Sequence, residues 1–119
     1  MADRVNRIKT LIDKIIRDTM MFKVKDPNLG IVFINEVVVN NDFSFAKVFV
    51  TFADKKNKEK KLKILDKVKG LFRSELARNL DIRKIPQVAF YYDETYDNYD
   101  RIEALIKKEQ KELDEMKKK

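Results

Sequence analysis

The sequence predicts one α+β domain whose elements follow the order α-β-β-α-α-β. Apolar residues recur at steps of three and four in residues 3–22 and again in residues 64–76, as on the buried side of a helix. Two β-branched runs with a polar turn between them separate these helical regions, and a third run follows Pro86. A chain of 119 residues is long enough for one hydrophobic core and short for two.

The first helix is expected over residues 3–22. Its apolar stripe consists of Val5, Ile8, Ile12, Ile15, Ile16 and Thr19, widened by Leu11 and Met20. Met20 and Met21 are both expected to pack in the core at the end of the helix. The helix should end before Pro27, because the residue before a proline avoids helical backbone angles.

Residues 31–39 are almost continuously β-branched, so we expect a strand with much of both faces covered. Residues 40–42, Asn-Asn-Asp, form a strong turn signal. Residues 43–52 then alternate, with Ala46, Val48, Val50 and Phe52 on one side. A connection this short predicts an antiparallel hairpin. The third strand, residues 87–92, is expected to run parallel to the second through a right-handed crossover.

The second helical region follows a charged loop at residues 54–61 and contains Gly70. A glycine inside a helix costs about 1 kcal/mol relative to alanine, so it usually marks a kink, a close approach or a junction. We interpret this region as two helices joined at or near Gly70, the second ending near Asn79.

Residues 98–119 are predicted to form a C-terminal helix, which leaves residues 1–97 as the main domain. Asp97 or Asn98 can cap this helix. Its one apolar turn consists of Ile102, Leu105 and Ile106. We therefore expect the helix to be partly docked, with a frayed end.

The residue types that are missing narrow the chemistry. The chain has no His, Cys or Trp, which excludes histidine- and thiolate-based catalysis and the usual zinc sites. With only Gly30 and Gly70, it cannot build a phosphate loop or a dinucleotide fingerprint. No apolar run is long enough to span a bilayer. Arg4, Arg7 and Lys9 interrupt the apolar residues near the N-terminus, so we expect no export signal. We expect a cytoplasmic, monomeric binding protein that is not an enzyme and needs no cofactor.

The net charge of +7 is concentrated in two segments. Residues 1–25 contain seven basic and three acidic side chains, a net charge of +4, and residues 54–85 contain twelve and five, a net charge of +7. Both segments are predicted to be helical, and a one-sided positive surface favours polyanions. Lysine-rich codon usage would explain 20 lysines among 27 basic residues, but not their concentration in these segments.

Two helices joined at a glycine between a hairpin and a third strand resemble the KH family of single-stranded RNA binders. In that family a GxxG turn lets the nucleic-acid backbone approach closely. The corresponding residues here, 68–71, read Val-Lys-Gly-Leu, so GxxG is absent. Element order alone is a weak pointer, because many small α+β domains share it.

Five motifs in chain order resemble bacterial ribosome-binding factor A much more specifically. Residues 26–30, Asp-Pro-Asn-Leu-Gly, are similar to the family's D-P-x-L-G turn, and residues 42–51, Asp-Phe-Ser-Phe-Ala-Lys-Val-Phe-Val-Thr, to its D-L-S-x-A-K-V-Y-V-S strand. Residues 70–76, Gly-Leu-Phe-Arg-Ser-Glu-Leu, resemble its G-F-L-R-S-E-L helix. Residues 85–90 with 93–95 resemble V-P-E-L-x-F followed by D-x-S, and residues 101–106 resemble R-I-x-x-L-L.

This resemblance implies a type II KH-like fold with a three-stranded sheet covered by helices on one face. An A-x-G kink replaces GxxG in the family, although Val68 stands here where alanine is usual. The resemblance also implies binding to the 30S ribosomal subunit and its 16S rRNA late in maturation, with roles in rRNA processing and cold adaptation. A maturation GTPase would help release. The basic C-terminal extension of some members is replaced by a mixed-charge segment.

Basic side chains near Gly70 are the candidate RNA-binding residues. Lysine supplies a point charge, whereas arginine can grip a phosphate with two hydrogen bonds. A helix beginning at Gly70 would also offer free N–H donors to a phosphate. We therefore predict recognition of RNA shape and backbone. The candidates are Lys69, Gly70, Arg73, Lys63, Lys67, Arg78, Arg83 and Lys84, with Arg4 and Arg7 as an extension. The alternative is that these are merely solvated helix faces.

Two other side-chain groups have simpler interpretations. An aromatic stripe on strands is more often core than a stacking platform, although the side on which Phe45, Phe49 and Tyr91 would lie stays open. The full stripe is Phe43, Phe45, Phe49, Phe90, Tyr91 and Tyr92. The acidic residues Asp93, Glu94, Asp97 and Asp100 lack calcium-loop spacing, and turn or cap chemistry accounts for them.

Two other functions compete with a role as a ribosome maturation factor. The first is a protein-interaction module whose basic surface meets an acidic partner. The second is a carboxylate-dependent nuclease that would use Asp93 or Asp97.

Overall fold

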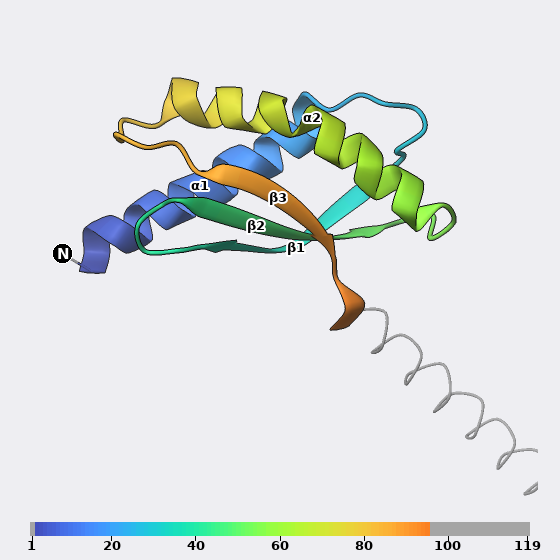
Figure 1. Ribbon diagram of the computed structural model, residues 1–119, viewed down its shortest axis with the longest axis horizontal. Coiled ribbons are helices and arrows are strands. Elements are labelled where there is room, and N and C mark those ends of the chain that lie inside the picture. The colour runs from blue at the N-terminus through green and yellow to red at the C-terminus, as the bar shows by residue number, and fades with distance from the viewer. Residues whose placement is uncertain (1, 96–119) are drawn as a thin grey trace, which may run out of the picture.

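The computed structural model describes residues 2–95, which form two long helices and one three-stranded sheet (Figure 1). The elements in chain order are α1 (Ala2–Phe22), β1 (Val32–Val39), β2 (Phe45–Phe52), α2 (Lys58–Asn79) and β3 (Gln87–Tyr92). The predicted α+β class is confirmed. The predicted C-terminal helix, and with it the boundary at residue 97, lies outside the described residues.

The sheet has the strand order β1-β2-β3, with β2 in the centre. As predicted, β1 and β2 are antiparallel and β2 and β3 are parallel. The register pairs Val32 with Phe52 in the hairpin and Phe45 with Gln87 across the parallel pair. The register shifts between Ile34 and Glu36, so the residue between them, Asn35, has no directly opposite residue on β2.

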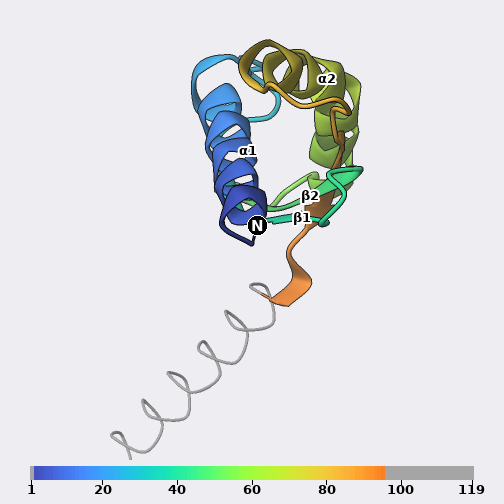
Figure 2. The ribbon, with the colours of Figure 1, turned by 90° about the vertical axis from the view of Figure 1, so that its left-hand side faces the viewer.

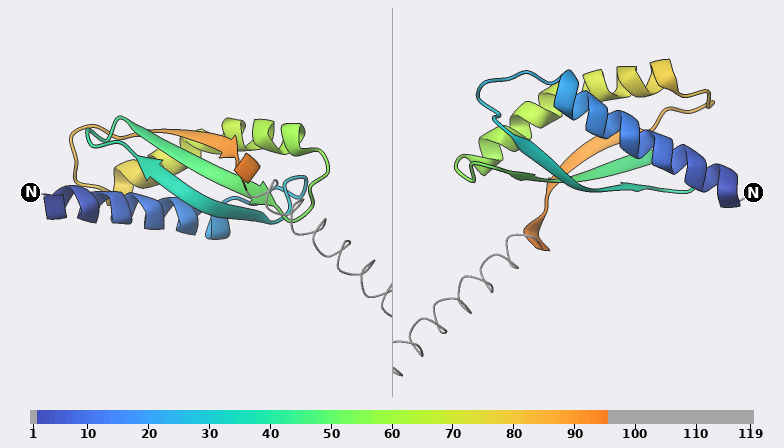
Figure 3. Two further views of the ribbon diagram at one scale, coloured as in Figure 1. Left: turned by 90° about the horizontal axis from the view of Figure 1, so that it is seen from below. Right: turned by 180° about the vertical axis from the view of Figure 1, so that it is seen from behind.

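One face of the sheet forms the core, and both helices lie on it (Figures 2 and 3). The alternation predicted for β2 is confirmed, because Ala46, Val48 and Val50 are fully buried. The helices contribute the fully buried residues Ile12, Ile16, Leu65, Phe72 and Leu76. The ring of Phe72 meets Phe90 of β3 edge to face, with centroids 5.0 Å apart.

The prediction for Met21 was wrong. Met20 is buried, but Met21 is 73% exposed. Successive helix residues differ in direction by about 100°, and because Thr19 and Met20 already occupy the buried side, the next position turns away from the core. Met21 instead borders an open, mostly apolar cleft of about 520 Å³ that also includes Leu29 and Phe33.

Among residues 2–95, the covering predicted for both faces of β1 is found on one face only. Its residues alternate, and Phe33 and Val38 are exposed while Val37 packs against the core. Since β1 is an edge strand and both described helices lie on the same side of the sheet, residues 2–95 leave its second face uncovered.

The helix that contains Gly70 is continuous over Lys58–Asn79, so the predicted junction between two helices is absent. Figures 1 and 2 show that α2 changes direction partway along its length. Gly70 lies near the middle of this range and has no positive φ. The predicted kink is thus a bend within one hydrogen-bonded helix, since a glycine weakens a helix without ending it.

The turn between α1 and β1 depends on Asp26 and Gly30. The Asp26 carboxylate accepts a hydrogen bond from the backbone N–H of Asn28 at 2.9 Å, and Leu29 is buried beneath the turn. Gly30 has φ of 66°, in the left-handed region that costs other residues about 1–2 kcal/mol.

The two glycines should respond to alanine in opposite directions. Gly30→Ala should lower the free energy of unfolding by about 1 kcal/mol, because φ is positive there although no atom lies within 4 Å of the added Cβ. Gly70→Ala should raise it by about 0.5–1 kcal/mol, because the position is helical and equally open. Urea denaturation measures both. A loss of stability in Gly70→Ala would contradict the open surroundings of Gly70.

The buried carboxylate of Glu75 links α2 to the residue that directly follows α1. The Lys23 ammonium, just beyond α1, donates to Glu75 Oε1 at 2.8 Å, and Arg78 Nη1 lies 3.5 Å from the same oxygen. The hydrogen bond from Lys23, aided by the charges of Lys23 and Arg78, holds the pKa of Glu75 below its ordinary value despite its burial.

Replacing Glu75 should make stability less dependent on pH. A carboxyl group whose pKa is lowered by folding stabilises the protein above its unfolded pKa and stops doing so as pH falls through its folded pKa. Glu75→Gln should therefore lower the melting temperature at about pH 7, and the deficit should vanish by about pH 2. Thermal unfolding followed by circular dichroism at several pH values tests this, with the exposed Asp18→Asn as control. An equal deficit at every pH would contradict it.

Candidate nucleic-acid interface

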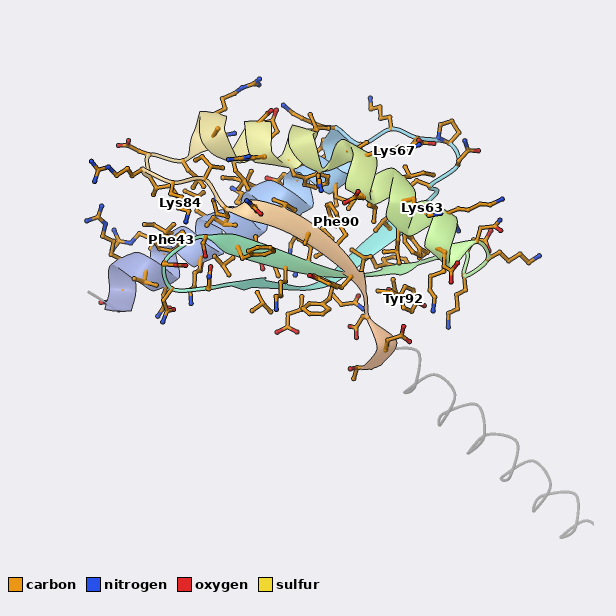
Figure 4. The ribbon with its side chains drawn as sticks, viewed as in Figure 1. Phe43, Lys63, Lys67, Lys84, Phe90 and Tyr92 are labelled. Atoms are coloured by element: carbon orange, nitrogen blue, oxygen red, sulfur yellow. The ribbon has the colours of Figure 1, made fainter. Side chains whose placement is uncertain are left out.

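All ten candidate positions are exposed, and they separate into two groups. The α2 group consists of Lys63, Lys67, Lys69, Gly70, Arg73 and Arg78. The end group consists of Arg4 and Arg7 on α1 and Arg83 and Lys84 in the loop before β3. Figure 4 shows Lys63 and Lys67 on α2, far from Lys84, which lies at the opposite end of the domain near Phe43. The prediction that Arg83 and Lys84 lie near the bend was therefore wrong, and Arg4, which was predicted to extend that surface, lies beside them instead.

Gly70 provides open space on the outer surface of α2. No atom lies within 4 Å of the point where a Cβ would stand, so a ligand backbone can approach the helix there. The predicted free N–H donors are absent, because the N–H groups of a continuous helix bond to carbonyls four residues earlier. Any anion at Gly70 must therefore be held by side chains.

Lys63 and Lys67 surround this space together with Lys69 and Arg73. Residues three and four apart share one side of a helix, so Lys63, Lys67 and Gly70 lie along one line, and Lys69 and Arg73 along another. Within the described residues the structure gives Lys63, Lys67 and Arg73 no carboxylate partner. Their charges are available to a ligand.

Two members of the α2 group contact carboxylates. Lys69 Nζ lies 3.1 Å from Asp66 Oδ1, and both side chains are more than half exposed. An exposed pair of this kind contributes little, so an RNA phosphate can compete for the lysine. Arg78 instead lies beside Glu75, where its positive charge helps balance the buried carboxylate. Arg78 has a structural role that the sequence did not reveal.

Members of the end group line a hollow of about 380 Å³ between α1 and the loop before β3. Arg4, Arg83 and Lys84 contribute its positive charge, and Asp42 and Asp81 its negative charge. Arg7 lies one helical turn from Arg4 and does not line this hollow. The tertiary structure thus brings three candidate residues together from two distant segments.

Phe43 borders the same hollow and has an unusual backbone, with φ of 59°. Bulky residues rarely adopt this conformation, and such strain tends to occur at functional sites. The N–H of Phe43 donates to the carbonyl of Asn40 at 3.0 Å, which holds the loop in place. The sequence indicated a turn at residues 40–42, but nothing in it indicated that Phe43 would lie beside Arg83 and Lys84.

Asp42 remains ionised within this hollow. The hydroxyl of Ser44 donates to its Oδ1 at 2.7 Å and the N–H of Ser44 donates to the same atom at 3.1 Å. These two hydrogen bonds, with a smaller contribution from the charge of Lys84, lower the pKa of Asp42 below its ordinary value. Asp42 and Asp81 offset part of the positive charge, so the α2 group is the more strongly basic of the two.

The aromatic side chains divide between the two faces of the sheet. Phe90 and Tyr92 point toward the core face, where Phe90 meets Phe72. Phe45, Phe49 and Tyr91 lie on the opposite face, and the rings of Phe49 and Tyr91 are 5.8 Å apart. The alternation of the strands therefore settles which side these three residues occupy.

Asp93 takes part in the turn chemistry predicted for the acidic residues after β3. Its Oδ1 accepts from the N–H of Thr95 at 3.1 Å, and its Oδ2 accepts from the side-chain amide of Asn35 at 3.0 Å. Asp97 and Asp100 lie outside the described residues. Within residues 2–95, no helix is long and apolar enough to cross a membrane.

A three-stranded sheet with two helices on one face, one of them bent at its middle, defines a KH-like α+β domain. The particular family follows from the comparison of sequences. The family model described as ribosome-binding factor A matches residues 4–106, and the chain belongs to this family.

Relatives and solved structures agree with this assignment. The chain is 34% identical to ribosome-binding factor A of Thermodesulfovibrio yellowstonii, over 95% of this chain and 96% of the relative. It is 38% identical to that of Macrococcus caseolyticus, over 89% and 94%. The crystal structure of ribosome-binding factor A from Thermus thermophilus shares the fold, with a TM-score of 0.64, 20% identity and coverage of 73% of this chain and 92% of that one.

A second similar structure is a Thermus thermophilus ribosome-binding factor A homology model fitted into a cryo-electron microscopy map of its complex with the 30S subunit. It has a TM-score of 0.59 and 19% identity, and covers 71% of this chain and 90% of that one. At this identity the likeness concerns the fold.

Proposed function

We propose that this protein binds the 30S ribosomal subunit and contacts 16S rRNA late in the maturation of that subunit. The observation that supports this most directly is the α2 group, a set of exposed basic side chains around the open space at Gly70. Membership of the ribosome-binding factor A family and the 30S complex of a Thermus thermophilus relative support the 30S subunit as the binding target.

The α2 group suits the backbone of a folded RNA. Lys63 and Lys67 supply point charges on one side of the open space, and Arg73 can grip a phosphate with two hydrogen bonds. The missing side chain at Gly70 lets the sugar-phosphate backbone come close to the helix. Contacts of this kind position a protein on RNA by shape and charge.

The end group extends the proposed contact to the other end of the domain. Arg4, Arg83 and Lys84 meet in one hollow, and the half-buried ring of Phe43 at its border offers a surface on which a base can stack. Two separated basic sites favour a structured RNA that presents phosphates at both positions over a short single strand.

The remaining parts of the proposal follow from the family. The protein acts by binding and not by catalysis, as a monomer in the cytoplasm, where the 30S subunit is assembled. It supports 16S rRNA processing and growth in the cold, and a maturation GTPase promotes its release.

Cosedimentation with 30S particles across a salt series tests the proposed function. A linear decrease in the logarithm of the affinity with the logarithm of the salt concentration would support phosphate contacts. A protein that never pellets with subunits at low salt would instead favour the acidic-protein partner. Cleavage of RNA that requires Mg²⁺ and is lost in Asp93→Asn would favour the nuclease.

Reversing charge in the α2 group should weaken binding specifically. Lys69→Glu with Arg73→Glu should lower affinity for 30S particles about tenfold or more and reduce the salt slope by about 1 for each phosphate that is no longer bound. Far-UV circular dichroism should be unchanged because both side chains are exposed. Lys14→Glu with Lys25→Glu changes the net charge equally at exposed positions outside both groups. An equal drop in affinity in the two double variants would assign the effect to net charge alone.

A side chain at Gly70 should obstruct binding without harming the fold. Gly70→Leu adds a good helix former in open space, so stability should be maintained or increased. Affinity for 30S particles should fall because the RNA backbone no longer comes close. Ala77→Leu, two turns further along the exposed side of α2, is the matched control. Undiminished binding by Gly70→Leu would contradict a close approach of the RNA backbone at Gly70.

A further inference from the structure

One end of the domain has a hollow whose chemistry differs from that of the α2 group. We use the name end hollow for the space of about 380 Å³ between α1 and the loop before β3. Its lining combines exposed charged side chains with apolar side chains that are half-buried. The apolar residues are Val5, Ile8, Phe43 and Ile82. Figure 4 shows Phe43 and Lys84 together at this end of the domain.

The charged side chains of the end hollow have both signs. Arg4, Arg83 and Lys84 are cations, whereas Asp42 and Asp81 are carboxylates. Two carboxylates weaken a site for phosphate alone, because they repel the phosphodiester. An apolar lining also contributes nothing to the binding of a phosphate. The end hollow therefore suits a ligand that combines an anion, a flat apolar surface and hydrogen-bond donors, and a nucleotide has all three.

The two carboxylates differ in how far their oxygens are engaged. Asp42 Oδ1 accepts from the hydroxyl and the N–H of Ser44, and the charge of Lys84 acts on the same carboxylate. Among residues 2–95, neither oxygen of Asp81 has a hydrogen-bond or ion-pair partner. An ionised carboxylate has two acceptor oxygens and no donor. Asp81 can therefore accept two hydrogen bonds side by side from a ligand.

The turn that places Phe43 in the end hollow is fixed by hydrogen bonds. The N–H of Phe43 donates to the carbonyl of Asn40 at 3.0 Å, and the side-chain amide of Asn40 donates to Ser44 Oγ at 2.6 Å. The carbonyl of Ser44 accepts from the N–H of Gln87 at 3.0 Å, which attaches the turn to the start of β3. A ring that is fixed before the ligand arrives loses less conformational entropy on binding.

Guanine is the base whose donors match a carboxylate with two unengaged oxygens. Its Watson–Crick edge presents N1–H and N2–H₂ as adjacent donors. Adenine and cytosine each present one donor beside a ring-nitrogen acceptor, and uracil presents one donor between two carbonyl acceptors. Among the four bases, only guanine can donate to both oxygens of a carboxylate without placing an acceptor against it.

We propose that the end hollow binds one unpaired guanine of the RNA, an inference that rests on the proposed function. The guanine stacks on Phe43, and its N1–H and N2–H₂ donate to the two oxygens of Asp81. Arg4 and Arg83 bind the adjoining phosphates. The α2 group then recognises the RNA backbone, and the end hollow adds sequence information at one position.

Binding of pentanucleotides to the full-length chain tests the identity of the base. In UUGUU, UUAUU and UUIUU only the central base changes, and inosine (I) lacks the 2-amino group of guanine. An NMR titration at low salt that follows the amide N–H signals should show about tenfold tighter binding of UUGUU than of UUAUU, with UUIUU between them. The guanine-specific shifts should occur at residues 42–43 and 81–84, which border the end hollow.

Replacing Asp81 should abolish the preference for guanine without weakening RNA binding in general. Asp81→Asn presents one acceptor and one donor in place of two acceptors, so UUGUU should bind no more tightly than UUAUU. Removing a negative charge should leave the affinity for UUAUU equal or slightly higher. Asp18→Asn makes the same charge change at an exposed position outside the end hollow and should preserve the preference. Far-UV circular dichroism should be unchanged in both variants, because both side chains are exposed.

Several results would overturn the proposal. Equal affinities of the unaltered chain for UUGUU and UUAUU, or no binding of any pentanucleotide, would mean that the end hollow does not select guanine. A preference that persists in Asp81→Asn would exclude Asp81 as the acceptor. Guanine-specific shifts around Gly70 would assign the base to the α2 group. None of these results requires a loss of cosedimentation with 30S particles, so a failure of this inference is distinguishable from a failure of the proposed function.

Discussion

The fold depends on the one-sided burial of the central strand. Ala46, Val48 and Val50 of β2 are completely buried, and their small or branched side chains leave space for helices to pack closely. Because β2 lies between an antiparallel and a parallel neighbour, the chain must cross over the sheet between β2 and β3, and α2 is that crossover. α1 packs beside α2 on the same face of the sheet. A core with one layer of sheet and one of helices follows from this constraint.

The same constraint determines where charge is available. With Leu65 and Phe72 committed to the core, the opposite side of α2 must point to water, and that side includes Lys63, Lys67 and Gly70. Lys61, in the first turns of α2, does not point to water. It is buried, its ammonium donates to the carbonyl of Asp54, and it lies 5.4 Å from the centre of the Phe52 ring. That lysine helps attach the start of α2 to the sheet and is not available to a ligand.

The two sides of the domain are chemically different. The helical side presents basic groups, which suit the phosphates of a large folded RNA. The face of the sheet that residues 2–95 leave uncovered presents the apolar side chains of Phe33, Phe45 and Tyr91.

The sequence alone predicted the α+β class and the relative directions of the three strands, because these depend on local periodicity and on connection length. The alternation of β2 and the stripe of α1 are local features of this kind. It could not show that residues 2–95 leave one face of β1 uncovered or that Met21 points to water, since both depend on which sides of the sheet and helix are covered. It likewise could not show that Arg4 meets Arg83 and Lys84 while Arg78 is drawn to Glu75. Contacts between segments far apart in the chain were decided only by the tertiary structure, because residue spacing does not encode the path of the chain between them.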